Sequence, residues 1–188
     1  MVMLDRAVHN MLVDCGRLQP GERVLIVHEP ASSGYYDDLL APAVAQSART
    51  QGIEVSLIEE PVSECPRVTD ELSEAMAAHE LTVFLARIGD QIRFKPAGAA
   101  ERAIVCYAID LTTLNSPFGA ISHAAMIALR DRVDAAFARA EEIRVTCPAG
   151  TDLRGRVSGL EPPKDTNTLR FPQLGYTPIP AVGFSGRI

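Results

Sequence analysis

Hydrophobic and polar residues follow two different periods along the first part of the chain. Apolar residues recur at helical spacing over residues 3–18 and 37–51, which predicts two amphipathic helices. Thr69 is placed as the N-cap of a further helix that runs to about His79. Between these helices lie short apolar runs, typical of strands covered on both faces. The predicted strands are residues 23–28, 54–58, 81–86 and 103–109.

The order of these elements predicts the fold class. Strands that alternate with helices are joined by right-handed crossovers and lie parallel in one sheet. We therefore expect an α/β fold over residues 1–141, with a mostly parallel central sheet and helices on both faces. A helical pattern resumes across residues 121–140 and closes this domain.

The remaining residues, 142–188, predict a smaller β appendage that packs on the domain. Residues 143–147 and 152–157 flank a Pro-Ala-Gly turn and form a hairpin. The proline-rich residues 159–181 indicate an irregular extended crossing, and residues 181–188 a last edge strand.

Composition narrows the class of protein. A net charge of −6 disfavours nucleic acid as a partner. No apolar run approaches the ~20 residues that cross a bilayer, and no signal peptide opens the chain, so we expect a cytoplasmic protein without a membrane partner. The four cysteines are dispersed without a Cys-x-x-Cys pair, which predicts reduced, mostly buried thiols.

Local motifs point away from catalysis. The turn after the first strand holds a single glycine, which disfavours dinucleotide or ATP binding, and its serines are expected to cap a helix. No histidine pairs with another ligand at metal spacing. We therefore expect no catalytic residue, metal or cofactor. Ser32, Arg87 and Arg93 are left open as residues that line a small-molecule cleft at the carboxyl ends of the strands.

Three stretches resemble a known family: residues 18–27, 51–55 and 141–153, the last ending in Gly-Thr-Asp-Leu. They are similar to the thermophilic-type aminopeptidases (aminopeptidase T/S, the M29 metallopeptidases), to which the dihydroxypyridine dioxygenases are related. The resemblance implies that the metal ligands belong to a second domain beyond this point. Only 35 residues follow Leu153, and none is His. Where the family has its first ligand carboxylate, the matching stretch holds Gly175.

The resemblance implies a pseudoenzyme that stands alone and binds a peptide, since the parent family handles peptides. Such a protein resembles the peptide-binding proteins of crocagin-type natural-product biosynthesis, which present a ribosomally made precursor peptide to a modifying enzyme. We expect an extended peptide to add as a strand at residues 143–147, 152–157 or 181–188. The site residues that receive acidic side chains or a terminal carboxylate are Arg144, Arg154, Arg156 and Arg170.

Two alternatives remain open. The same strand edges are equally expected to pair within a homodimer, which is compatible with peptide binding. The second alternative is that the chain is the truncated N-terminal half of a metallo-aminopeptidase or of a metal-dependent ring-cleaving dioxygenase. An end at Ile188 in what reads as mid-strand favours truncation, whereas Gly175 favours the binding protein.

Overall fold

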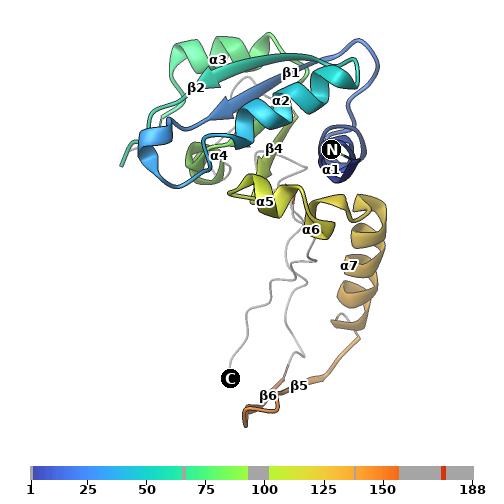
Figure 1. The fold of residues 1–188 in the computed structure, drawn as a ribbon. Helices are drawn as coiled ribbons and strands as arrows, with labels where there is room; N and C mark the ends of the chain where they lie inside the picture. Colours follow the sequence, from blue (N-terminus) through green and yellow to red (C-terminus); the bar gives the residue numbers. More distant parts are fainter. Residues whose placement is uncertain (1, 65–66, 93–101, 138, 157–174, 177–188) are drawn as a thin grey trace.

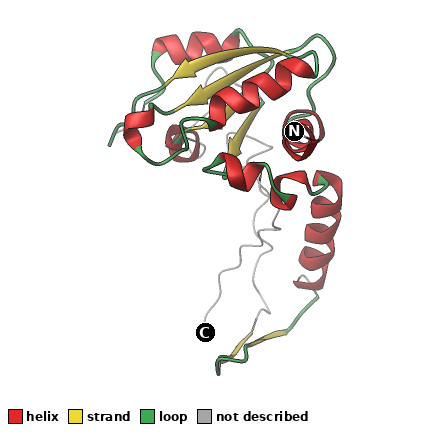
Figure 2. Ribbon diagram, viewed as in Figure 1, coloured by secondary structure: helices red, strands yellow, loops and turns green. Residues whose placement is uncertain are grey.

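The computed structural model describes residues 2–64, 67–92, 102–137, 139–156 and 175–176. The described strands form a parallel sheet in the order β2-β1-β3-β4-β7 and a separate antiparallel pair, β5-β6 (Figures 1 and 2). The sheet strands are β1 (Arg23–His28), β2 (Glu54–Glu59), β3 (Leu81–Leu85), β4 (Ala103–Cys106) and β7 (Gly175–Tyr176). The pair consists of β5 (Glu142–Thr146) and β6 (Asp152–Arg156). The predicted fold class is confirmed.

Helices cover both faces of the sheet. The chain opens with α1 (Val2–His9), which continues directly as the π-helix η1 (Asn10–Cys15). The remaining helices are η2 (Ala31–Ser33), α2 (Leu40–Thr50), α3 (Asp70–Ala77), α4 (Arg87–Ile92), α5 (Leu111–Leu114), α6 (Pro117–Ala120) and α7 (His123–Phe137).

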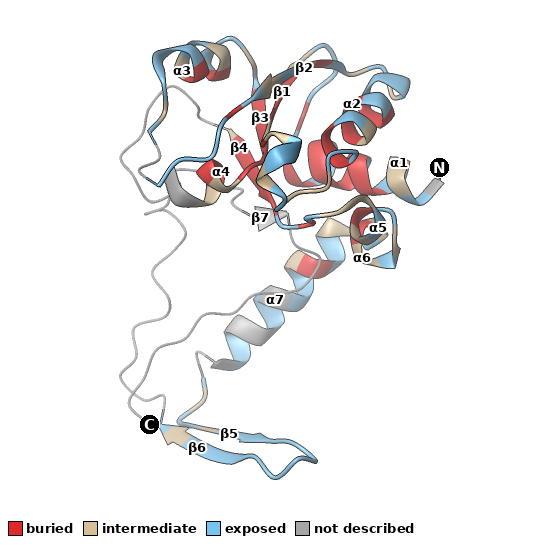
Figure 3. Cartoon of the chain, turned by 60° about the vertical axis from the view of Figure 1, so that its left-hand side comes forward, coloured by how far each residue is buried: buried red, intermediate tan, exposed pale blue. Residues whose placement is uncertain are grey.

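Alternate residues of each strand enter two separate cores, as the pleat requires. Val24 and Ile26 of β1 pack with α1, η1 and α2 on one face, whereas Leu25 and Val27 pack with α3 on the other. Both layers are buried, and the buried residues lie on β1, β3 and β4 and on the helix faces turned toward them (Figure 3). Strands with two covered faces explain the continuous apolar runs in the sequence.

Most predicted elements are confirmed, with changes at their ends. Thr69 caps α3, since its Oγ1 accepts a hydrogen bond from the backbone N–H of Leu72 at 3.1 Å. The predicted fourth strand, 103–109, is too long, because the chain leaves the sheet after Cys106 and Asp110 becomes the N-cap of α5. Short helices α4, α5 and α6 were not predicted, because four to six residues are too few to show a helical period.

β7 corrects the prediction for residues 159–181. Within that expected irregular crossing, Gly175 and Tyr176 pair in parallel with Val105 and Cys106 of β4. The predicted strand over residues 181–188 lies outside the described residues.

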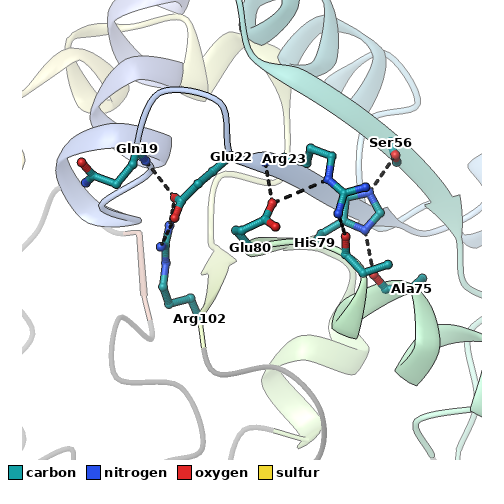
Figure 4. A network of polar contacts seen from close by, with 9 residues as sticks. Gln19, Glu22, Arg23, Ser56, Ala75, His79, Glu80 and Arg102 are labelled. Atoms are coloured by element: carbon teal, nitrogen blue, oxygen red, sulfur yellow. Dashed lines mark hydrogen bonds and ion pairs between the residues drawn. The ribbon is translucent and has the colours of Figure 1, made fainter.

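Polar contacts fasten the amino ends of the strands (Figure 4). Arg102, just before β4, forms two hydrogen bonds to the Glu22 carboxylate before β1, at 2.8 and 3.1 Å. The Glu80 carboxylate accepts the backbone N–H of Arg23 at 2.8 Å. His79 bridges the end of α3 and Ser56 of β2 through its two ring nitrogens. These contacts hold neighbouring strands together at their amino ends.

Helix α7 leads away from the sheet and ends at the β5-β6 hairpin (Figures 1 and 3). Its start is held by the buried Asn10, whose Nδ2 donates to the carbonyl of Ile121 at 2.9 Å and of Gly119 at 3.4 Å. Met126 is buried, whereas Leu129 is 47% exposed. Among the α7 side chains that the structure describes, the buried one therefore lies in the first turn of the helix.

Candidate functional site

The β5-β6 hairpin forms because its turn has the residues that the geometry requires. The backbone N–H of Gly150 donates to the carbonyl of Cys147, and the N–H of Cys147 donates to the carbonyl of Thr151, both at 3.1 Å. Gly150 has a φ of +100°, a conformation that a side chain would strain. The predicted hairpin and its Pro-Ala-Gly turn are confirmed.

The two faces of the hairpin differ in chemistry. Residues directly opposite each other point to the same face, and the register pairs Val145 with Leu153 and Arg144 with Arg154. One face is therefore apolar and the other is charged. Val145 is 43% exposed and Leu153 is 40% exposed, so this apolar face is largely open to solvent.

The hydrogen-bonding pattern shows which backbone groups face outward. Because Cys147 and Thr151 form a hydrogen-bonded pair, the pairs further along alternate between hydrogen-bonded and non-hydrogen-bonded. The non-hydrogen-bonded pairs direct their N–H and C=O groups to the outer edges. These outward residues are Glu142, Arg144 and Thr146 on β5, and Asp152, Arg154 and Arg156 on β6. In the described part of the chain no further strand pairs with either edge.

The structure brings three of the four predicted site arginines onto this hairpin. Arg144 forms two hydrogen bonds to the Asp152 carboxylate, at 2.7 and 2.9 Å, and this contact lowers the pKa of Asp152. Arg154 and Arg156 are exposed on β6, and no ion pair to either is found among the described residues. Arg170 lies outside the described residues. The cationic groups that remain available are therefore on the β6 edge.

One thiol departs from the sequence prediction. Cys15 and Cys106 are buried, and burial raises the pKa of each thiol to about 12. Cys147, however, is exposed at the hairpin turn, where a hydrogen bond to the Thr151 side chain lowers its pKa. Cys65 lies outside the described residues.

A second polar cluster lies at the carboxyl ends of the sheet strands. The strand order places β2 and β3 on opposite sides of β1, so the crossovers reverse direction between β1 and β3. Doubly wound sheets bind ligands outside the strand ends at such a reversal. Here Glu29 follows β1 and Arg87 follows β3, and the two side chains meet in this position.

Glu29 and Arg87 form an ion pair at the point where the crossovers reverse direction. The Glu29 carboxylate, 2% exposed, accepts hydrogen bonds from the Arg87 backbone N–H at 2.6 Å and from its Nη2 at 2.8 Å. Burial works to raise the pKa of Glu29, but the contacts with Arg87 outweigh it and the pKa is lowered. Tyr35 covers the guanidinium, with 4.7 Å between the Arg87 Cζ and the ring centroid. The place of an anionic ligand is thus filled by the protein's own carboxylate.

Sequence reasoning singled out Arg87 but missed its partner. Glu29 directly follows a strand whose four central residues are all apolar, which is the signal that it emerges at the carboxyl end of a buried sheet. The expected capping role of the serines is not observed, because η2 and α2 have no side-chain cap. Asp37 instead accepts the Leu39 N–H, as expected for a carboxylate at a helix start. Arg93 lies outside the described residues.

Neither a metal-binding cluster nor a membrane-spanning helix is found in the residues that the structure describes. No group of three or more His, Cys, Asp or Glu residues there is arranged to hold a metal ion. None of the helices in the same ranges combines the length and apolar character that crossing a membrane requires.

Comparison with known proteins found little similarity. No family model matches the chain, and no curated protein matches it. Among solved structures, the chain is similar to the 2,5-dihydroxypyridine dioxygenase of Pseudomonas putida KT2440, with 14% identity and a TM-score of 0.43. The match covers 92% of this chain and 52% of the dioxygenase, so the chain spans about half the length of that protein.

Proposed function

We propose that this chain is a non-catalytic, cytoplasmic peptide-binding protein that holds an extended peptide along the outer edge of β6. A ribosomally made precursor peptide presented to a modifying enzyme is the ligand class that this function would serve. The observation that carries the proposal is the β6 edge itself. It combines outward backbone groups with Arg154 and Arg156, which have no ion-pair partner in the described ranges.

The register of the hairpin defines the peptide that fits. A peptide residue opposite Arg154 or Arg156 points to the charged face, and the residue between them points to the apolar face beside Leu153. The complementary peptide therefore alternates acidic and apolar residues. Main-chain hydrogen bonds supply affinity that does not depend on sequence, and the two arginines supply the preference for acidic residues.

Fluorescence anisotropy with a labelled Glu-Val-Glu-Val-Glu peptide tests this proposal. We expect micromolar binding, and an otherwise equal Lys-Val-Lys-Val-Lys peptide should bind more weakly because its charges repel those of the edge. Replacing both Arg154 and Arg156 by Gln should weaken binding about 2- to 30-fold, since exposed ion pairs contribute roughly 0.2–1 kcal/mol each.

Proline substitutions separate the two edges. Arg154→Pro removes an outward N–H without removing a hydrogen bond between β5 and β6, so it should abolish binding beyond the effect of Arg154→Gln. Arg144→Pro removes the equivalent outward N–H from β5, together with the ion pair to Asp152, and serves as the control. Equal loss in both variants, or unchanged binding in Arg154→Pro, would contradict strand addition at β6.

A further inference from the structure

A small cleft opens at the carboxyl ends of the strands, beside the Glu29–Arg87 pair and separate from the hairpin. Its volume is about 20 Å³, which suits a group of the size of one water molecule. Residues 60–63 and Arg67, which follow β2, form one wall, and the start of α4 forms another. Its lining residues include Glu60, Val62, Ser63, Arg67, Arg87 and Ile88.

Glu60 is the unusual residue of this cleft. Its backbone N–H donates to the carbonyl of His28 at 2.8 Å, which holds the residue at the edge of the sheet. The residue is only 9% exposed, and its carboxyl group makes no hydrogen bond or ion pair with the described residues. Burial raises the pKa of Glu60, and the nearby Glu71 raises it further. An unpaired carboxylate in this position costs free energy, which a cation from outside would recover.

Neither arginine of the cleft forms an ion pair with Glu60. Arg87 directs its Nε and Nη2 to Glu29, which leaves Glu60 without a partner from α4. Arg67 lines the cleft, but it forms no ion pair with Glu60 in the described structure. The cleft thus presents an unmatched carboxyl group and an unmatched guanidinium on different residues of its lining.

We propose that this cleft binds a free α-amino acid, with the ammonium group at Glu60 and the carboxylate at Arg67. The enclosed volume admits only the ammonium group beside the buried Glu60, and the rest of the amino acid lies on the solvent side, where Arg67 is exposed. A zwitterion satisfies both charges at once, whereas a simple amine or a simple acid satisfies one and leaves the other unpaired. This site shares no residue with the β6 edge, so it stands independently of the peptide proposal.

Titrations followed by amide chemical shifts of Ala86, Arg87 and Ile88 test the assignment. The three probes are L-alanine, L-alaninamide, which lacks the carboxylate, and N-acetyl-L-alanine, which lacks the ammonium group. We expect saturable millimolar binding of alanine, several-fold weaker binding of alaninamide and none of N-acetylalanine. Equal binding of alaninamide and alanine would overturn the assignment to a free amino acid, and binding of N-acetylalanine would overturn the role of Glu60.

Variants locate the two contacts. Glu60→Gln should weaken alanine binding at least about tenfold, because it removes the charge at nearly constant shape. Arg67→Ala should reduce alanine to the level of alaninamide. Glu59→Gln, which removes the neighbouring exposed carboxylate at the end of β2, is the matched control and should leave binding unchanged. Binding that survives Glu60→Gln, or the absence of saturable shifts with alanine, would overturn the proposal.

Discussion

At the scale of single residues, two buried glutamates at one edge of the sheet have opposite electrostatic situations. Glu29 is paired with Arg87 and its pKa is lowered, whereas Glu60 is unpaired and its pKa is raised. Both follow a strand directly, so the sequence around them gives no reason to expect different pairing or different pKa values. The difference arises from which neighbours the sheet order brings to each carboxyl group.

Glu29→Gln is expected to lower the free energy of unfolding by about 2 kcal/mol near neutral pH, because it leaves Arg87 without its anion. This is below the usual cost of breaking a buried pair, since the Arg87 side chain is 34% exposed. A lowered pKa in the folded state stabilises the protein above the unfolded value of ~4.3, and this stabilisation is lost as the pH falls through the folded pKa. Urea unfolding from about pH 7 to pH 3 should therefore show the two proteins converging in acid.

Glu60→Gln is expected to show the opposite dependence. A raised pKa in the folded state favours folding below the unfolded value, and this contribution is lost as the pH rises through the folded pKa. As the pH rises from about 4 to about 8, the stability difference should therefore move in favour of the variant. The same unfolding series measures it, with Glu59→Gln as the exposed control. A difference that does not change with pH would mean that the pKa of Glu60 is the same in the folded and unfolded states, which would contradict its buried, unpaired environment.

At the scale of elements, the arm formed by α7 and the hairpin depends on a short anchor. Asn10→Ala removes both hydrogen bonds that the buried Asn10 amide makes to the α6–α7 junction, at a cost of about 1–3 kcal/mol. We expect faster amide hydrogen exchange in the first turns of α7, measured by mass spectrometry. Asp14→Ala, an exposed change on the same π-helix, is the control and should leave the exchange of α7 as it is. Equal protection in the Asn10 and Asp14 variants would contradict this role for Asn10.

At the scale of the whole molecule, we propose that the hairpin pairs with a second copy of the chain. A two-stranded hairpin alone is marginal in water, and Val145 and Leu153 leave an apolar face exposed. A second copy of the chain would cover the β5 edge by antiparallel pairing about a two-fold axis. Centred on Ile143, such pairing places Glu142 of one copy opposite Arg144 of the other, so opposite charges meet. We propose this homodimer as compatible with a peptide on β6.

Sedimentation velocity over a range of concentrations tests the homodimer. We expect dimers at micromolar concentrations, because two short strands bury little area. Arg144→Pro should shift the protein to monomers, since it removes an outward N–H from the β5 edge. Arg154→Pro should leave the dimer intact while it abolishes peptide binding. A wild-type protein that stays monomeric at every concentration would show that β5 does not pair in this way.

The sequence by itself determined the elements whose side chains follow a regular period. Residues 23–28 were predicted as a strand because the four central residues, Val24–Val27, are all apolar, as expected for a strand buried on two faces. The hairpin was predicted because its turn requires glycine at positive φ. Periodicity and turn chemistry are local properties, and they were sufficient for the fold class.

Only the tertiary structure determined which residues from distant parts of the sequence are neighbours in space. The pairing of Glu29 with Arg87 joins residues 58 positions apart, and it depends on β1 and β3 being neighbours in the sheet. The unmatched state of Glu60 and the short β7 strand beside β4 depend in the same way on packing between distant segments. Charge and hydrogen bonding at a site depend on distance in space, which a one-dimensional pattern of residue types does not contain.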